Sequence, residues 1–309
     1  SNYSHLKYWL IIDRPGIAVY FVKDSASDDS NDGLNPLTPK KTINAAITIA
    51  TAPATILVST GTYNVNSDTT GVQTHIEPTE GVSISGGYND SFTIKDSLNY
   101  ETIITDVSSE YQTGGVTSAH NSGAPIRVPI GVTSATVLDN LSLNGSSTAG
   151  IRYSAGLYLL GAVTLLNSKV FGGAGFSSSV AIYANTNSVS KIKGNLILGG
   201  DSPSYANGVI IYTTDTILDS NKISGDFAIT VGNHATPTVI NNLIYSTNSG
   251  IYNNNGSSII KNNTIISADR GILNQNLSTP TIENNIISAT RCILEASNKK
   301  VSQKNISIK

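Results

Sequence analysis

Residues 239–245 (VINNLIY), 259–266 (IIKNNTII) and 281–288 (TIENNIIS) repeat one pattern, in which aliphatic residues flank an asparagine. Outward from these stretches, the pattern recurs at 135–143, 163–170, 191–198, 217–224 and 301–308. The aligned asparagines, 20 to 28 residues apart, are Asn140, Asn167, Asn195, Asn221, Asn242, Asn263, Asn285 and Asn305. A repeat of this period predicts a solenoid, in which each coil is stabilised by its neighbours.

A second marker follows the asparagine, a small residue and then an aliphatic one. It occurs at Ala181-Ile182, Gly208-Val209, Ala228-Ile229, Gly250-Ile251, Gly271-Ile272 and Cys292-Ile293. A leucine-rich repeat would need a different leucine spacing and a helical return, whereas these repeats are rich in Ile, Val, Thr, Asn and Gly, which disfavour helix. The pattern therefore favours an all-β solenoid with three short strands in each coil.

Stacked coils of this kind exchange parallel hydrogen bonds at a rise of roughly 4.8 Å. The aliphatic residues three before and two after the asparagine are expected to point inward. These are Val137, Ile192, Leu218, Val239, Ile260 and Ile282, and then Ile197, Ile223, Ile244, Ile265 and Ile287. We expect the asparagines to stack as a structural ladder, and we assign them no catalytic role.

The first 135 residues are less regular. Strands are expected at 17–22, 55–59, 82–85, 102–105 and 126–128, and an amphipathic helix at 40–52. Such a helix would cover the open end of the solenoid. We expect one domain over 1–309, made of a strand, a loop and a capping helix (1–53), irregular coils (54–135) and regular asparagine coils (136–309). The connections 63–78 and 106–124 are expected to be projecting loops.

Composition narrows the class of protein. The chain has 309 residues, 13% of them charged, with a formal net charge of −2, one Cys and no Met. Such a charge balance makes no cationic field for nucleic acid, and no apolar run is long enough to be a transmembrane segment. Low charge, scarce sulfur and a start at Ser1 fit an exported bacterial protein, secreted or at the cell surface.

The N-terminal sequence resembles a known module. Residues 20–50 (YFVKDSASDDSNDGLNPLTPKKTINAAITIA), then ILVSTGTYN (56–64) and ISGGYNDSF (84–92), resemble the opening of secreted and surface bacterial right-handed parallel β-helix proteins of the pectin-lyase-like superfamily. The resemblance implies an all-β, right-handed parallel β-helix with an N-terminal capping helix. It leaves function open, because the superfamily includes lyases, hydrolases, tailspikes, adhesins and inert surface proteins.

In the lyases of this superfamily, the substrate lies along the outer face of the strand that carries the second marker. Here the outward row is Tyr158, Tyr183, Ile210, Thr230, Tyr252, Leu273 and Leu294, without a carboxylate or base. The turn before it supplies the candidate catalytic residues Asp201, Asp226, Asp269, Arg270 and Arg291. Asp226 and Asp269 would lie roughly 10 Å apart, beyond the separation of a glycosidase pair. The favoured interpretation of these charges is a solvated turn with an ion pair.

The tyrosines are candidate ligand-binding residues. Tyr158, Tyr183, Tyr212 and Tyr252 would present rings along the rod, and a ring suits the apolar face of a sugar. Tyrosine is also simply favourable on an exposed strand. Lys193 with Asp219, and Lys261 with Glu283, are expected to form surface charge pairs on adjacent coils.

An acidic loop near the N-terminus is the candidate metal site. Its oxygen ligands for Ca²⁺ would be Asp24, Asp28, Asp29, Asn31 and Asp32. The spacing is not that of an EF-hand, and such turns also form without a metal.

The sequence thus predicts a non-catalytic scaffold that binds a polysaccharide or a host-surface glycan. The first alternative is a polysaccharide lyase or glycoside hydrolase that acts on acidic, pectin-like polysaccharide, and the second is a purely structural surface protein.

Overall fold

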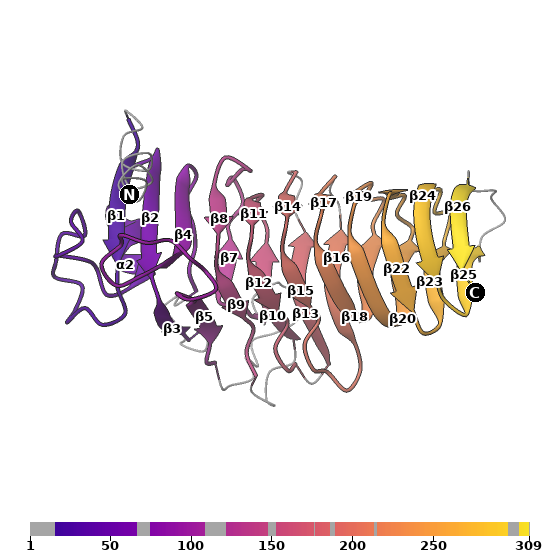
Figure 1. The fold of residues 1–309 in the computed structure, drawn as a ribbon, viewed down its shortest axis with the longest axis horizontal. Coiled ribbons are helices and arrows are strands. Elements are labelled where there is room, and N and C mark those ends of the chain that lie inside the picture. The colour runs from indigo at the N-terminus through magenta and orange to yellow at the C-terminus, as the bar shows by residue number, and fades with distance from the viewer. Residues whose placement is uncertain are drawn as a thin grey trace, which may run out of the picture.

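The computed structural model describes residues 16–66, 75–108, 122–147, 153–175, 177–185, 189–212, 215–295 and 303–308. Its strands wind into an elongated rod that runs from the N-terminal to the C-terminal end (Figure 1). All pairings between the named strands are parallel, and they link residues on successive coils. The chain is therefore a parallel β-helix, as the repeat period predicts.

Three strand stacks run along the rod. The first stack is β1 (Ala18–Val22), β2 (Ala54–Ser59), β4 (Val82–Tyr88), β8 (Val137–Asp139), β11 (Thr164–Leu166), β14 (Lys191–Lys193), β17 (Ile217–Asp219), β19 (Thr238–Ile240), β21 (Ile259–Lys261), β24 (Thr281–Ser288) and β26 (Gln303–Ile308). The second is β3 (Gly61–Val65), β5 (Thr102–Asp106), β9 (Ser142–Asn144), β12 (Lys169–Phe171), β15 (Leu196–Leu198), β18 (Lys222–Gly232), β20 (Leu243–Asn254), β22 (Thr264–Ser267) and again β24 and β26. The third is β6 (Ser122–Gly123), β7 (Ile126–Val128), β10 (Tyr153–Leu159), β13 (Ser178–Asn185), β16 (Ala206–Tyr212), the later parts of β18 and β20, β23 (Arg270–Gln275) and β25 (Arg291–Glu295).

The asparagine ladder runs through five buried members, Asn195, Asn221, Asn242, Asn263 and Asn285. From Asn221 onward, each side-chain oxygen accepts from the backbone N–H and the amide of the ladder asparagine one coil earlier, as Asn263 Oδ1 does from Asn242 at 2.9 and 3.1 Å. Each amide nitrogen also donates to a backbone carbonyl, as Asn242 Nδ2 does to Leu218 O at 2.9 Å. The ladder satisfies the polar groups of a bend that would otherwise be buried unpaired.

Two of the eight aligned asparagines are not in this ladder. Asn140 and Asn167 have positive φ values of 54° and 47°, like Asn241, one residue before the ladder position. The ladder position in their coils is held by Leu141 and Ser168, and Ser168 N donates to Asn195 Oδ1 at 2.8 Å. The sequence alignment was wrong by one residue there, because asparagine suits both the ladder and the left-handed bend. The side chain of Asn305 lies outside the described residues.

The core consists of aliphatic rows inside the rod, and ten of the eleven predicted inward residues are fully buried. The exception is Val137, which is only half-buried, while Leu138 takes the inward place. This error follows from the same one-residue shift in the alignment.

The helix α2 (Ile43–Ile49) covers the N-terminal end of the rod, shorter than the predicted 40–52 (Figure 1). Thr42 caps it by accepting from Ala45 N, and Ile43 and Ala46 are buried in the core. The helix thereby covers this end of the core, while the free edge of β1 bonds to the loop before the helix, where Phe21 N donates to Gly33 O at 2.8 Å and Phe21 O accepts from Lys40 N at 2.9 Å. Residues 67–74 and 109–121, which include most of the two predicted long loops, lie outside the described residues.

Candidate ligand-binding face

The outer face of the third stack carries two parallel rows of side chains. Strand pairing aligns Arg127, Tyr158, Tyr183, Ile210, Thr230, Tyr252, Leu273 and Leu294 in one row, called here the tyrosine row. It aligns Asn207, Phe227, Ser249, Arg270 and Arg291 in the neighbouring row, called here the flanking row. Because each step along a row is one coil, both rows form periodic platforms at a spacing of roughly 4.8 Å.

Three of the four predicted tyrosines form one aromatic group. The rings of Tyr158 and Tyr183 stack with centroids 5.1 Å apart and an angle of 5° between their planes. Tyr212 meets Tyr183 edge to face at 5.9 Å. Tyr158 is only 4% exposed, so it supports Tyr183 from the side, whereas Tyr183 and Tyr212 remain half-buried.

These rings lie outside the main core. Tyr158 belongs to a separate apolar cluster with Ala124, Ala155 and Val180, against which Tyr183 packs. Burial raises the pKa of Tyr158 to about 12, and the neighbouring phenol of Tyr183 adds to the effect. Burial likewise raises the pKa of Tyr183 and of Tyr212. These phenols are therefore neutral at physiological pH and offer apolar ring faces with hydroxyl hydrogen bonds.

The fourth tyrosine, Tyr252, belongs to a second aromatic group that sequence reasoning missed. Its ring lies 5.6 Å from that of Phe227, and Phe227 lies 6.0 Å from Tyr205. The sequence did contain a signal for Phe227, because it lies two residues before the inward Ile229. That position pairs with Asn207 in the flanking row. Tyr205 is 55% exposed and lies in a turn outside the strand pattern, so the repeat gave no indication of it.

The arginines adjoin this second group. Arg270 occupies the flanking row one coil after Ser249, and its Nη1 donates to Asn248 Oδ1 at 3.2 Å. Its positive charge opposes the rise in the pKa of Tyr252, which burial causes first and Tyr212 increases. The predicted ligand-binding residue Tyr252 and the predicted charged residue Arg270 therefore lie next to each other.

Asp269 holds the two arginines together. Its carboxylate lies 3.1 Å from Arg270 Nε and accepts from Arg291 Nε at 3.0 Å and from Arg291 Nη2. The hydrogen bond from Arg291 is the main cause that holds the pKa of Asp269 below its usual range, and the charge of Arg270 adds to it. A general acid needs the opposite shift, so this carboxylate is poorly suited to protonate a leaving group.

The other two candidate catalytic acids do not join this cluster. Asp226 lies two coils before Asp269, where its oxygens accept from Ala206 N at 3.1 Å and Thr247 Oγ1 at 2.6 Å. Asp201 is exposed earlier in its turn, and its backbone bonds to Gly173 O. The five residues therefore form one three-residue ion cluster and two separate acids.

The acidic loop folds through its own hydrogen bonds. Asp28 Oδ1 accepts from Ser30 N, Asp32 Oδ1 accepts from Leu34 N and Thr38 Oγ1, and Asn31 Nδ2 donates to Pro39 O. Asp29 instead binds the start of α2, through Lys41 N and Thr42. Among the residues that the structure describes, no three His, Cys, Asp or Glu side chains are arranged to hold a metal ion. The function proposed below does not depend on calcium.

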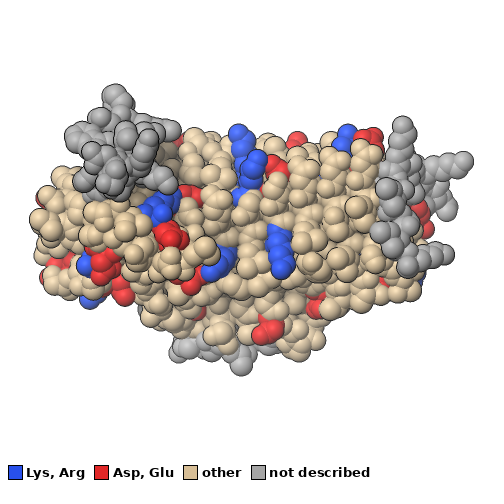
Figure 2. Space-filling view, in the orientation of Figure 1, with Lys and Arg blue, Asp and Glu red and all other residues tan. Residues whose placement is uncertain are grey.

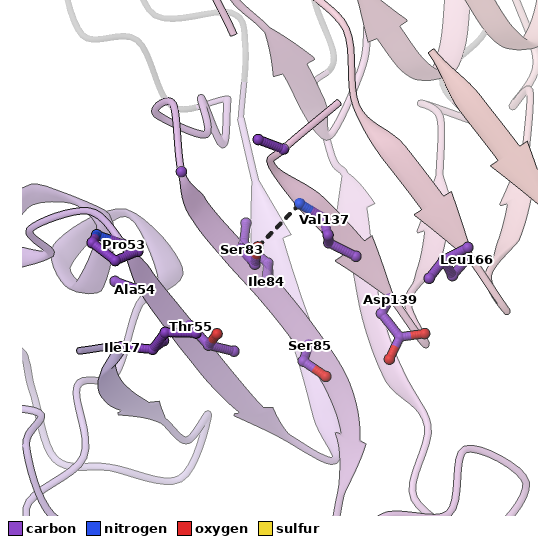
Figure 3. Close-up of a pocket in the computed structure, with 12 residues that line it drawn as sticks. Ile17, Pro53, Ala54, Thr55, Ser83, Ile84, Ser85, Val137, Asp139 and Leu166 are labelled. Atoms are coloured by element: carbon purple, nitrogen blue, oxygen red, sulfur yellow. Dashed lines mark hydrogen bonds between the residues drawn. The ribbon is translucent and has the colours of Figure 1, made fainter. Parts of the chain in front are cut away.

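A separate hollow lies on the outer face of the first stack, where β4 and β8 pair at only two positions (Figure 3). It has a volume of about 410 Å³, and Ser83 and Val137 face each other across it through a hydrogen bond of 3.1 Å. Its carboxylate, Asp139, already accepts from Lys95, Asn140 and Asn167. This hollow contains none of the predicted site residues.

Charged side chains are crowded toward the N-terminal end of the rod and sparse over much of the face shown in Figure 2. The two predicted charge pairs form, with Lys193 Nζ 2.9 Å from Asp219 and Lys261 Nζ 3.0 Å from Glu283. Both pairs lie on the first stack, away from the tyrosine row. Pairs of this kind at the surface contribute under about 1 kcal/mol each.

Comparison with known proteins bears on the fold. Residues 180–308 match the family described as a right handed beta helix region. The chain folds as a right-handed parallel β-helix. Pectate lyase Pel9A has a similar fold, with a TM-score of 0.61, 13% identity and coverage of 94% of this chain and 74% of the lyase. Pectin methylesterase from carrot is more distant, at a TM-score of 0.43 and 12% identity, with 94% and 88% covered.

At such low identity these similarities concern the fold alone. No curated protein sequence matches the chain significantly. The only helix among the described residues is α2, which is far too short to cross a membrane.

Proposed function

We propose that this β-helix is a non-catalytic scaffold, secreted or at a bacterial cell surface, that binds a polysaccharide along the outer face of its third stack. The observation that carries the proposal is the presence of two aromatic groups along this face, Tyr183 with Tyr212 and Tyr252 with Phe227. Sugars bind proteins by stacking their apolar faces on such rings while their hydroxyl groups exchange hydrogen bonds at the edges.

The polar groups around the rings suit this role. Tyr252 Oη donates to Gln275 Oε1 at 2.8 Å, and Thr230 Oγ1 lies 3.4 Å from Asn207 Oδ1. Amide and hydroxyl groups at a ring edge both donate and accept, as sugar hydroxyls do. The rod shape also fits a chain ligand, because the same outward positions recur coil after coil.

Catalysis is the weaker alternative. The tyrosine row holds no carboxylate, and Asp269, which directly precedes Arg270 of the flanking row, is bound by two arginines. Retaining hydrolysis requires two carboxyl groups within about 5.5 Å, and inversion requires them within about 9.5 Å. Asp226 and Asp269, two coils apart, fall at roughly 10 Å, and the pKa of Asp269 is lowered.

The test is binding of the purified protein to a glycan array, followed by calorimetry on the best neutral oligosaccharide. We expect Tyr183→Ala and Tyr252→Ala each to weaken binding about tenfold, because each removes a stacked ring. Tyr245→Ala is the matched control, because Tyr245 is a half-buried tyrosine on the second stack. Unchanged binding in both site variants, or release of shortened or unsaturated sugars from a bound polymer, would contradict the proposal.

A further inference from the structure

The distribution of charge along the binding face is uneven. From Tyr158 to Leu294 the tyrosine row contains no charged residue, although it crosses seven coils. In the flanking row, Asn207, Phe227 and Ser249 are uncharged and only the last two positions are charged, both of them arginines. The face therefore has a long neutral aromatic part that lies between Arg127, which is paired with Glu77, and a cationic end at Arg270 and Arg291.

The cationic end is only partly neutralised. Arg270 and Arg291 share one carboxylate, that of Asp269, so the three groups keep one net positive charge. Arg270 Nε is buried without a hydrogen-bond partner, since Asp269 Oδ2 is near it but poorly aligned. The Arg270 side chain is still 26% exposed, next to the ring of Tyr252. An anion that reaches this guanidinium gains a charge-assisted hydrogen bond.

The neutral part would reject a ligand with a charge on each sugar. Carboxylates over the aromatic rings would lose hydration without a cation to replace it. One of them would also approach Asp226, which lies at the edge of the face next to Phe227 and is already bound to Ala206 N and Thr247. A polyanion and the neutral part of this face are therefore badly matched.

Resting on the function proposed above, we infer that the ligand is a predominantly neutral glycan carrying one anionic group, which binds Arg270 while neutral sugars stack on Tyr252 and Tyr183. The anionic group, a carboxylate or a sulfate, fixes the position of the chain along the rod. Between the positions of Tyr183 and Arg270 lie four coil steps, which span roughly 19 Å.

The experiment compares matched probes in the same buffer: xylotetraose, xylotetraose bearing a single 4-O-methylglucuronic acid, and tetragalacturonate. We expect the singly acidic probe to bind about tenfold more tightly than the neutral one and tetragalacturonate to bind more weakly than either. The preference should fall as salt is raised, because one exposed ion pair is screened.

Two variants with opposite expected effects on the preference for the singly acidic probe distinguish this inference from a folding defect. Arg270→Gln should abolish the preference and leave xylotetraose binding within about twofold. Asp269→Asn should increase the preference, because it removes the competing carboxylate. Lys222→Gln, an exposed cation on the second stack, is the control and should change neither.

Each outcome is decisive. A preference for tetragalacturonate, or equal binding of neutral and singly acidic probes, would overturn the inference and leave glycan binding intact. Absence of binding to all three probes, with no acidic or neutral glycan bound on an array, would instead overturn the proposed function.

Discussion

Tyr158 and Tyr183, register partners on β10 and β13, stack almost in parallel at 5.1 Å, although only Tyr183 is open to a ligand. The buried ring fixes its neighbour in one orientation, which lowers the entropy that a binding platform loses when it is occupied. The pair links the fold to the site, because the coil register alone brings the two rings together.

This stack predicts an alkaline sensitivity. Burial raises the pKa of Tyr158 from 10.0 to about 12, so its contribution to stability is complete below pH 10 and is lost as the pH rises toward 12. Tyr158→Phe cannot ionise, and its loss of stability between pH 8 and pH 11 should be smaller by about 1 kcal/mol. Urea unfolding at the two pH values measures the difference. Tyr63, raised to about 12 as well, remains in both proteins and cancels. Identical losses in the two proteins would contradict the assignment.

A second prediction concerns the ladder. Asn242 Oδ1 accepts from Asn221 N at 2.8 Å and Nδ2 at 3.0 Å, and Asn242 Nδ2 donates to Leu218 O and Asn263 Oδ1. Asn242→Ala leaves these buried groups unpaired, and we expect the free energy of unfolding to fall by about 2–4 kcal/mol.

The neighbouring residue provides the control for that substitution. Asn241 is exposed and has a φ of 57°, which glycine adopts without strain. Asn241→Gly should change stability by less than about 0.5 kcal/mol in the same urea titration. If the two variants lost equal stability, the ladder would have no special role.

The one-residue error in the first two regular coils shows what the repeat could and could not predict. In later coils the doublets, such as Asn241 and Asn242, fill both the left-handed bend and the ladder. Asn167 is followed by Ser168, and with a single asparagine the pattern does not tell which place it holds. The spacing of the aliphatic residues distinguishes the two places, because the fully buried Leu165 lies three residues before Ser168, as expected for the ladder position. Buried residues thus define register more reliably than the polar residue that marks the repeat.

The fold was predictable because every coil repeats the same local physics, whereas the site depends on exceptions to the repeat. Phe227 and Arg270 occupy equivalent positions in the flanking row but share no residue type that a pattern would detect. Tyr205 reaches Phe227 from a turn. Such contacts follow from turn conformations, which the period of the coils does not encode.

The hydrogen bonds of Asp32 in the acidic loop lead us to expect a loss of stability in acid. The hydrogen bond from the Thr38 hydroxyl, followed by that from Leu34 N, holds the pKa of Asp32 below 3.8. Its contribution is present above pH 3.8 and disappears as the pH falls through the lowered value. Asp32→Asn keeps an acceptor oxygen but does not titrate, so its stability should decline less between pH 5 and pH 2. Urea midpoints across that interval measure this, with Leu37→Asn on the same loop, 88% exposed, as a non-titrating control whose profile should parallel that of the original protein.

The last prediction concerns the end of the rod that α2 covers. Asp29 Oδ1 accepts from Lys41 N and Thr42 N, both at 2.8 Å, and Asp29 Oδ2 accepts from Thr42 Oγ1 at 2.8 Å, so one carboxylate holds the residue that caps the helix. Asp29→Ala should lower the free energy of unfolding by about 1–2 kcal/mol, as loss of a helix cap does. Because loosening the helix exposes the buried Ile43 and Ala46, the variant should also be cleaved sooner near α2 under limited proteolysis.

Asp28→Ala is its matched control, because Asp28 accepts from Ser30 N within its own turn and does not contact the helix. It should leave both the unfolding free energy and the cleavage pattern close to those of the original protein. Equal proteolysis of the two variants would mean that α2 remains in place without Asp29, and that the buried Ile43 and Ala46 alone secure the end of the rod.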